Sequence, residues 1–143
     1  MKIAMNIFLL MCFITTGCSK DASTKDEILI SAAQIKESFE TYYDIPLSEP
    51  SGLSPENVFI RNLNGVKPET YTMNENQFIS FYVFSNKQEA EKGLKEFENS
   101  TAAAELVMHS KYQIANVLLF YVADEAVKDG RVKDIMEGFL VTK

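Results

Sequence analysis

Cysteine and histidine are scarce in this sequence of 143 residues. The two cysteines, Cys12 and Cys18, both lie near the start, so residues 19–143 can form neither a disulfide nor a thiolate metal site. His109 is the only histidine, and a transition-metal site around it would need carboxylates as its other ligands. We therefore predict no metal and no cofactor.

Sequence signals for nucleotide and nucleic-acid binding are also missing. The chain has no glycine-rich phosphate loop of the dinucleotide or Walker type. Its 14 Lys and Arg are outnumbered by 20 Asp and Glu, which gives a net charge of −6. Nucleic-acid binding is disfavoured because it needs basic surface that displaces phosphate counterions. Electrostatic attachment to anionic lipid is disfavoured too, so membrane attachment would have to be hydrophobic.

Catalytic patterns are weak. A Ser–His–acid triad would have to use His109, but no G-x-S-x-G elbow is present, and we expect His109 in a turn. Four glutamates are interleaved with lysines: Glu89, Glu91, Glu96 and Glu98. This interleaving is typical of a solvated helix face. We predict no catalytic residue, although composition leaves open a hydrolase that uses two carboxylates.

Residues 1–17 have the layout of a secretory signal peptide. Lys2 gives a positive start, an apolar run of about twelve residues follows, and residues 15–17 are small. As a helix this run would be about 18 Å long, whereas the hydrocarbon core of a bilayer is about 30 Å thick. A permanent transmembrane helix is therefore the weaker interpretation.

Gly17 followed directly by Cys18 resembles the lipobox of bacterial lipoproteins. Thr16 also fits that pattern, whereas Thr15 stands where the family usually has leucine. The resemblance implies cleavage between Gly17 and Cys18 and a diacylglyceryl group on the Cys18 sulfur, and Cys12 would leave with the signal peptide. The protein would then be held on the outer, extracytoplasmic face of the cell membrane. An ordinary signal peptide cut nearby and an uncleaved anchor are the alternatives.

As a whole, the chain resembles the small lipoproteins of Bacillus-type bacteria. The specific resemblance covers about residues 1–19 and assigns no functional residue beyond them. Residues 18–23 are small and polar after the cysteine, and we expect them to form a lipidated residue and a short tether. Residues 24–143 have the length of one globular domain.

The pattern of residues 24–143 predicts an α+β domain, with helices packed on one face of a mainly antiparallel sheet. We expect a first helix at about 25–42, because Thr24 and Glu27 have the spacing of a capping box. Asn64-Gly65 predicts a tight hairpin turn, and the proline that follows at position 68 predicts an edge strand or a short strand.

Two segments, 77–84 and 116–124, are apolar on both faces and predict buried strands. A capping box at Ser85 and Gln88 is expected to start the helix after the first of them. Between these elements we expect a short strand near residues 105–108, a turn at 109–111 and the start of another strand.

The final helix is expected to begin at Asp124 as its cap. Four apolar residues form its helical stripe: Val132, Ile135, Met136 and Phe139. The two strand–helix units resemble each other, which indicates either a duplication or merely the same order of strand, polar cap and amphipathic helix. Two helices on one face would leave the other face to the N-terminal helix or to a partner.

Taken together, these patterns predict a lipid-anchored, non-catalytic binding or accessory module with a protein partner at the cell surface. A small envelope hydrolase that uses carboxylates with His109 is one alternative. An immunity or inhibitor protein that blocks a secreted enzyme is another. The surplus of tyrosine and phenylalanine is expected to fill the core, although it could also line a groove for a peptide or a glycan.

Overall fold

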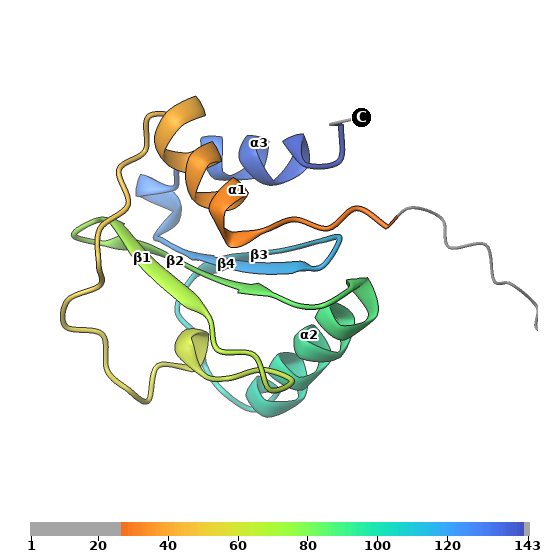
Figure 1. Ribbon diagram of the computed structural model, residues 1–143. Helices are drawn as coiled ribbons and strands as arrows, with labels where there is room; N and C mark the ends of the chain where they lie inside the picture. Colours follow the sequence, from red (N-terminus) through yellow and green to blue (C-terminus); the bar gives the residue numbers. More distant parts are fainter. Residues whose placement is uncertain (1–26, 142–143) are drawn as a thin grey trace, which may run out of the picture.

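A computed structural model describes residues 27–141 of the chain. The predicted signal peptide and the whole predicted tether at residues 18–23, including Cys18, lie outside these residues. The described part is one four-stranded antiparallel sheet with strand order β1-β2-β4-β3 and three α-helices, which confirms the predicted α+β class (Figure 1). The elements, in chain order, are α1 Ala32–Glu37, its π-helical continuation η1 Ser38–Tyr42, η2 Val58–Ile60, β1 Glu69–Asn74, β2 Gln77–Val83, α2 Lys87–Thr101, β3 His109–Ile114, β4 Val117–Val122, η3 Glu125–Val127 and α3 Arg131–Gly138.

The two central strands, β2 and β4, are buried on both faces, as the sequence predicted. Because successive side chains of a strand point to opposite faces, each strand supplies two cores. Ile79 and Leu119 face the core that contains α1 and α3, whereas Tyr82 and Phe120 face the core that contains α2 and η2. Each of the two faces therefore needs its own cover.

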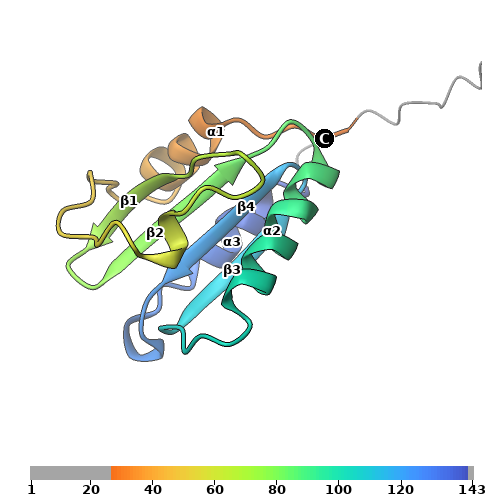
Figure 2. The ribbon, with the colours of Figure 1, turned by 90° about the horizontal axis from the view of Figure 1, so that it is seen from below.

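The prediction of helices on one face is wrong: helices cover both faces of the sheet. In Figure 1 the sheet lies between α1 and α3 above it and α2 below it, and Figure 2 shows α2 and α3 on opposite sides of β4. The N-terminal helix shares its face with α3, and α2 alone among the α-helices covers the other face.

This arrangement also separates the two similar strand–helix units. Two neighbouring antiparallel strands such as β2 and β4 can be exchanged by a two-fold rotation about an axis perpendicular to the sheet. Such a rotation leaves each helix on the same face of the sheet. Because α2 and α3 lie on opposite faces, no such rotation relates the units. Their resemblance is therefore a shared order of strand, cap and helix, without internal symmetry.

The first helix begins later than predicted. Its capping box is formed by Ser31 and Gln34: the Ser31 hydroxyl accepts from the Gln34 N–H, and the Gln34 side chain accepts from the Ser31 N–H. Residues 27–31 are not helical, and the Ile28 side chain is exposed. The Asn116 side chain binds both the N–H and the C=O of Ile30, so these groups cannot take part in a helix, and the helix starts after Ile30.

The predicted cap residues of the other two helices are also wrong, because each helix begins later in the sequence than predicted. Asn86, rather than Ser85, caps α2 by accepting from the Glu89 N–H. Asp124 precedes the short turn η3 instead of capping α3, whose N-terminal residue is preceded by Gly130. The apolar stripe of α3 is confirmed, since Val132, Ile135 and Met136 are buried and Phe139 packs against them. Among the helices of residues 27–141, none combines the length and the apolarity needed to cross a membrane.

The strand expected near 105–108 and the turn expected at 109–111 are wrong. Residues 109–114 form the edge strand β3, and the turn comes later, where Ala115 has a positive φ of 48°. Tyr112 and Ile114 are the hydrophobic residues of β3 that pack against the core containing α1 and α3. The strand expected after residue 111 is confirmed, but it begins earlier, at His109. An edge strand needs apolar side chains mainly on its covered face, so polar residues concealed its first half in the sequence.

The tight turn at Asn64-Gly65 is confirmed, with positive φ angles of 45° and 74° and a bridge between Leu63 and Val66 on either side of it. Its arms are one residue pair long, so the predicted hairpin has no extended strands. Pro68 directly precedes β1, which is an edge strand as predicted.

A buried asparagine joins the N-terminal segment to the sheet. The Asn116 side chain accepts from the Ile30 N–H at 2.7 Å and donates to the Ile30 carbonyl at 3.0 Å and the Phe84 carbonyl at 2.8 Å. Asn116 is 2% exposed. Its side chain therefore satisfies three backbone groups that water cannot reach.

We expect Asn116→Ala to lower the free energy of unfolding by about 2–4 kcal/mol, because each orphaned buried polar group costs about 1–3 kcal/mol. Denaturant unfolding measures the loss, and hydrogen exchange should show loss of protection at the Ile30 amide. The exposed Asn99 provides the control, since Asn99→Ala should change stability by less than about 0.5 kcal/mol. Equal stability of the two variants would contradict this role.

Helix α2 approaches the sheet closely at a glycine. A Cβ atom on Gly93 would lie 2.4 Å from Cζ of Phe84. The Phe84 ring is buried and stacked against Tyr82, so it has little room to move. Glycine at this position therefore sets the distance between α2 and the sheet.

We expect Gly93→Ala to destabilise the protein by about 1–3 kcal/mol through overpacking. Gly138→Ala is the matched control, because a Cβ atom added there would meet no atom within 4 Å and alanine favours helix. Thermal unfolding of both variants should show a lower Tm for the first and an unchanged or higher Tm for the second. A Tm for Gly93→Ala at or above that of the parent protein would show that the Phe84 ring yields freely.

Candidate binding groove beside the edge strand

The single histidine belongs to an aromatic cluster. His109 is the first residue of β3, and its ring lies 4.9 Å from that of Phe59 and 6.3 Å from that of Phe97, between ring centroids. Its Nδ1 atom lies 2.9 Å from the Val107 carbonyl oxygen. The expected position in a turn is therefore wrong, and these contacts give the imidazole a packing role instead of aligning it with a hydroxyl or a carboxylate.

The glutamates of α2 are spread along its surface and have separate partners. Glu91 pairs with Lys87, and Glu98 pairs with Lys111 of β3. Glu89 accepts from Lys92 and from the Asn64 side chain, while Glu96 accepts from the Asn64 N–H at 2.6 Å. Two of these glutamates therefore hold the Asn64-Gly65 turn against α2, a role that the sequence pattern did not reveal. Within residues 27–141, no group of three potential metal ligands comes together.

The pKa of Glu89 lies below its usual value, because Lys92 and the Asn64 side chain hydrogen-bond to the charged carboxylate. The pKa of Tyr82 is shifted in the other direction: burial raises the pKa of this phenol well above its usual value. The Tyr82 hydroxyl donates to the Arg61 carbonyl at 2.7 Å. Tyr82 thus fixes the end of η2, and Glu89 fixes the turn that follows it.

Most of the tyrosines and phenylalanines fill the two cores, as expected. Tyr121 is buried, and its hydroxyl donates to the Gln77 side chain and accepts from the Asp129 N–H. Gln77 in turn donates to the Val127 carbonyl. This chain of hydrogen bonds fastens the segment between β4 and α3 to the sheet. Tyr42 differs, since it is 71% exposed.

One groove of about 410 Å³ lies along the edge strand β1. Its walls come from the segment 49–53, from Ile60 of η2 and from residues 67–71. Pro50, Leu53 and Ile60 contribute apolar surface. Chain segments that are distant in sequence therefore form this groove, so no local motif indicated it.

The backbone of β1 gives the groove open hydrogen-bonding groups. Thr72 exchanges backbone hydrogen bonds with Ser48 at 2.9 and 3.0 Å, so the N–H and C=O of Thr72 point away from β2. In an antiparallel strand the direction of these groups repeats every second residue. The N–H and C=O of Thr70 therefore point outward as well, into the groove that Thr70 lines. The Thr70 side chain is turned toward the sheet, where its hydroxyl lies 3.1 Å from that of Ser80.

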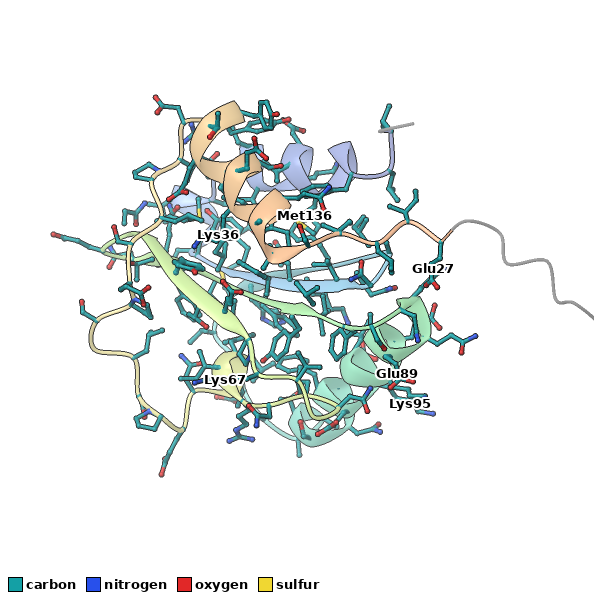
Figure 3. All side chains as sticks on the ribbon, in the orientation of Figure 1. Glu27, Lys36, Lys67, Glu89, Lys95 and Met136 are labelled. Atoms are coloured by element: carbon teal, nitrogen blue, oxygen red, sulfur yellow. The ribbon has the colours of Figure 1, made fainter. Side chains whose placement is uncertain are left out.

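Side chains of both charge signs, together with a tyrosine hydroxyl, surround this open edge. Glu49, Lys67 and Glu69 line the groove together with Tyr71, whose hydroxyl donates to Glu69 at 2.9 Å. Burial first, and then the hydrogen bond to Glu69, raise the pKa of Tyr71. Lys36 of α1 lies over the Tyr71 ring, 5.0 Å from its centroid, and Figure 3 labels this lysine and Lys67 on either side of β1. The Tyr71 phenol is thus a neutral hydrogen-bonding group at ordinary pH.

The other edge strand is less open to a further strand. Lys111 is at the centre of β3 and pairs with Glu98 of α2. A charged lysine in the middle of an edge strand discourages strand pairing. The central residues of β1, in contrast, are Thr70, Tyr71 and Thr72, which carry no charge. Of the two sheet edges, β1 is therefore the candidate binding site.

An ion pair on the face opposite α2 fixes the start of α3. The Arg131 guanidinium contacts both Asp129 carboxylate oxygens at 2.7–3.1 Å, and it also donates to the Tyr43 carbonyl at 2.8 Å. The Asp129 side chain is 19% exposed. The Arg131 side chain holds the pKa of Asp129 below its usual value.

We expect Asp129→Asn to destabilise the protein by about 1 kcal/mol at neutral pH. Because the folded pKa of Asp129 lies below the unfolded value, its contribution is present above the unfolded pKa and is lost as the pH falls through the folded pKa. The difference in unfolding free energy between the parent protein and Asp129→Asn should therefore shrink in acid. Asp134→Asn, on the exposed face of α3, is the control and should change the unfolding free energy at neutral pH by less than about 0.5 kcal/mol. A constant difference between pH 7 and acid would contradict the ion-pair explanation.

Comparisons with family models, with curated proteins and with solved structures found no match to this chain. Any assignment of function has to come from the chain's own residues and their geometry. The groove beside β1, with the outward N–H and C=O of Thr70, is the arrangement among the described residues best suited to bind another molecule.

Proposed function

We propose that this protein is an extracytoplasmic lipoprotein, anchored to the membrane through Cys18. Its folded domain acts as a non-catalytic binding module that takes an extended polypeptide segment along β1. The observation that carries the binding function is the open edge at Thr70 within the groove. The ligand class follows from that geometry, because an extended chain is the partner that can pair with backbone N–H and C=O groups in register.

The sequence supports the anchor. Residues 1–17 have the three parts of a secretory signal peptide, and Gly17-Cys18 resembles a lipobox. A single acyl chain gives only marginal membrane binding, whereas two chains give stable attachment. A diacylated Cys18 would therefore hold an acidic domain on the membrane without any basic patch.

The groove supports a polypeptide ligand in its chemistry as well as its shape. Extended peptides bind to sheet edges through main-chain hydrogen bonds, while side-chain pockets beside the edge give specificity. Pro50 and Leu53 offer apolar contacts, and Lys67 and Glu69 offer charges of both signs. A binding partner at the cell surface would reach this edge from the aqueous side.

The anchor is tested at Cys18. We expect Cys18→Ser to abolish incorporation of a clickable fatty acid and to release the domain from the membrane fraction. Cys12→Ser is the matched control, because Cys12 lies inside the apolar run and should leave both labelling and membrane attachment unchanged. Labelling that persists in Cys18→Ser would refute the proposed anchor.

The binding edge is tested at Thr70. Thr70→Pro removes the outward N–H and leaves the hydrogen bonds between β1 and β2 in place, and proline is tolerated on edge strands. Thr70→Val is the matched control, because it also loses the hydroxyl but keeps the N–H. Peptides selected on the parent protein from a displayed random library should bind Thr70→Val with similar Kd. They should bind Thr70→Pro about tenfold or more weakly.

Two results would refute the binding edge. One is a failure of the library to enrich any peptide that binds the folded protein. The other is enrichment of peptides that bind Thr70→Pro and the parent protein equally well. Far-UV circular dichroism and the Tm of both variants establish that the comparison is made between folded proteins.

A further inference from the structure

Exposed apolar side chains gather where the described chain begins and ends. Ile28 and Leu29 precede α1, and Leu140 and Val141 follow α3. Their exposed fractions are 46%, 57%, 59% and 79% in that order. Large apolar side chains exposed together at one place indicate an interaction surface more strongly than isolated ones.

Two of these residues, Ile28 and Leu140, meet at one end of the sheet. They share a hollow of about 370 Å³ with Ile114, the last residue of β3, and with Ala115 of the β3–β4 turn; Glu27, Lys87 and Gln113 complete its lining. Figure 1 shows the first and the last described residues of the chain at this end of the molecule. We call this surface, made of Ile28, Leu29, Leu140 and Val141 around the turn, the apolar end.

The start of the described chain is held firmly at the apolar end. The Lys87 N–H donates to the Glu27 carboxylate at 2.6 Å, and Asn116 holds Ile30. Figure 3 labels Glu27 beside the first turn of α2. The segment that leads back to Cys18 therefore leaves the domain from this end.

We infer that the apolar end docks on the lipid bilayer, with Ile28, Leu29, Leu140 and Val141 in contact with the membrane interface. This inference rests on the proposed lipid anchor at Cys18. From Cys18 to Glu27 the chain advances nine residues, which span at most about 30 Å when fully extended. The lipid would thus keep this end of the domain, before any other, near the membrane surface.

The tether makes weak apolar contacts effective. Four partly exposed side chains would not by themselves hold a soluble protein on a membrane. Once one lipid anchor is inserted, contact by the apolar end becomes an intramolecular step with a high effective concentration. Attachment at two points then also fixes the orientation of the domain, which a flexible tether alone does not do.

Exposed apolar residues at the far end of the sheet provide an internal comparison. Val107 and Met108 precede the start of β3, and Val127 lies in η3 after the end of β4. The six residues of β3 separate the two ends by about 20 Å. Similar side chains are therefore present both near the tether and far from it, and only those near the tether are inferred to contact lipid.

A single fluorophore tests this orientation. With Cys12 removed and Cys18 lipidated, a cysteine introduced elsewhere is the only free thiol of the mature chain. We would label Val141→Cys and, as the matched control, Val127→Cys with an environment-sensitive nitrobenzoxadiazole dye. The lipidated full-length products are then reconstituted into phosphatidylethanolamine–phosphatidylglycerol vesicles that contain doxyl-labelled lipid as quencher.

We expect the dye at position 141 to emit at shorter wavelength and to be quenched several-fold more than the dye at position 127. Adding Ile28→Asp and Leu140→Asp should reduce the quenching at position 141 toward the control value, because both side chains are exposed and can be changed without unfolding the domain. Equal quenching at the two positions, or stronger quenching at position 127, would overturn the inference.

Two further measurements separate this inference from the proposed anchor. Fatty-acid labelling of the same samples reports whether Cys18 carries lipid. If Cys18 is labelled and the dye at position 141 remains in water, the docking surface is refuted while the anchor stands; if Cys18 is unlabelled, both are refuted. Quenching or spectral shifts that require a high density of protein in the vesicles would assign the apolar end to a second copy of the chain and overturn docking on lipid.

Discussion

The structure depends on one constraint: β2 and β4 are apolar on both faces, so neither face of the sheet can be left to water. Alternating residues of these two strands supply two separate cores. One core takes α1 and α3 as its cover, and the other takes α2 together with η2. The segments at both ends of the described chain are therefore drawn onto the sheet, and Asn116 completes this by satisfying the backbone of Ile30 in a place without water.

With both faces covered, only the edges and ends of the sheet are free to contact other molecules. β3 carries Lys111 at its centre, whereas β1 borders a groove with the outward N–H and C=O of Thr70. The apolar end lies where the tether to Cys18 would leave the domain. The proposed peptide site lies at Thr70 on the edge of β1, and the proposed membrane contact lies at one end of the sheet, so the two surfaces can be used together.

Local sequence patterns predicted the features that depend on a few neighbouring residues. They missed the features that depend on contacts between segments far apart in the sequence. The tight turn at Asn64-Gly65 and the edge strand after Pro68 were predicted because they depend on backbone conformations that few residues allow. The helix caps were missed because several polar residues lie near each helix start. Thr24 with Glu27 and Ser31 with Gln34 offer the same capping chemistry, and the hydrogen bonds of Asn116 to the Ile30 backbone favour the second pair. The groove was missed because its walls come from segments that no local pattern connects.

The amino-acid sequence by itself determined the α+β class, the two buried strands and the apolar stripe of α3, because these follow from the periodicity of apolar residues along the chain. Only the tertiary structure decided that α2 and α3 lie on opposite faces, that His109 joins an aromatic cluster, and that Ile28 and Leu140 meet at one end of the sheet. Periodicity states that a face must be buried but does not state which partner buries it. That choice depends on the packing of segments far apart in the sequence, which is settled only when the whole domain folds.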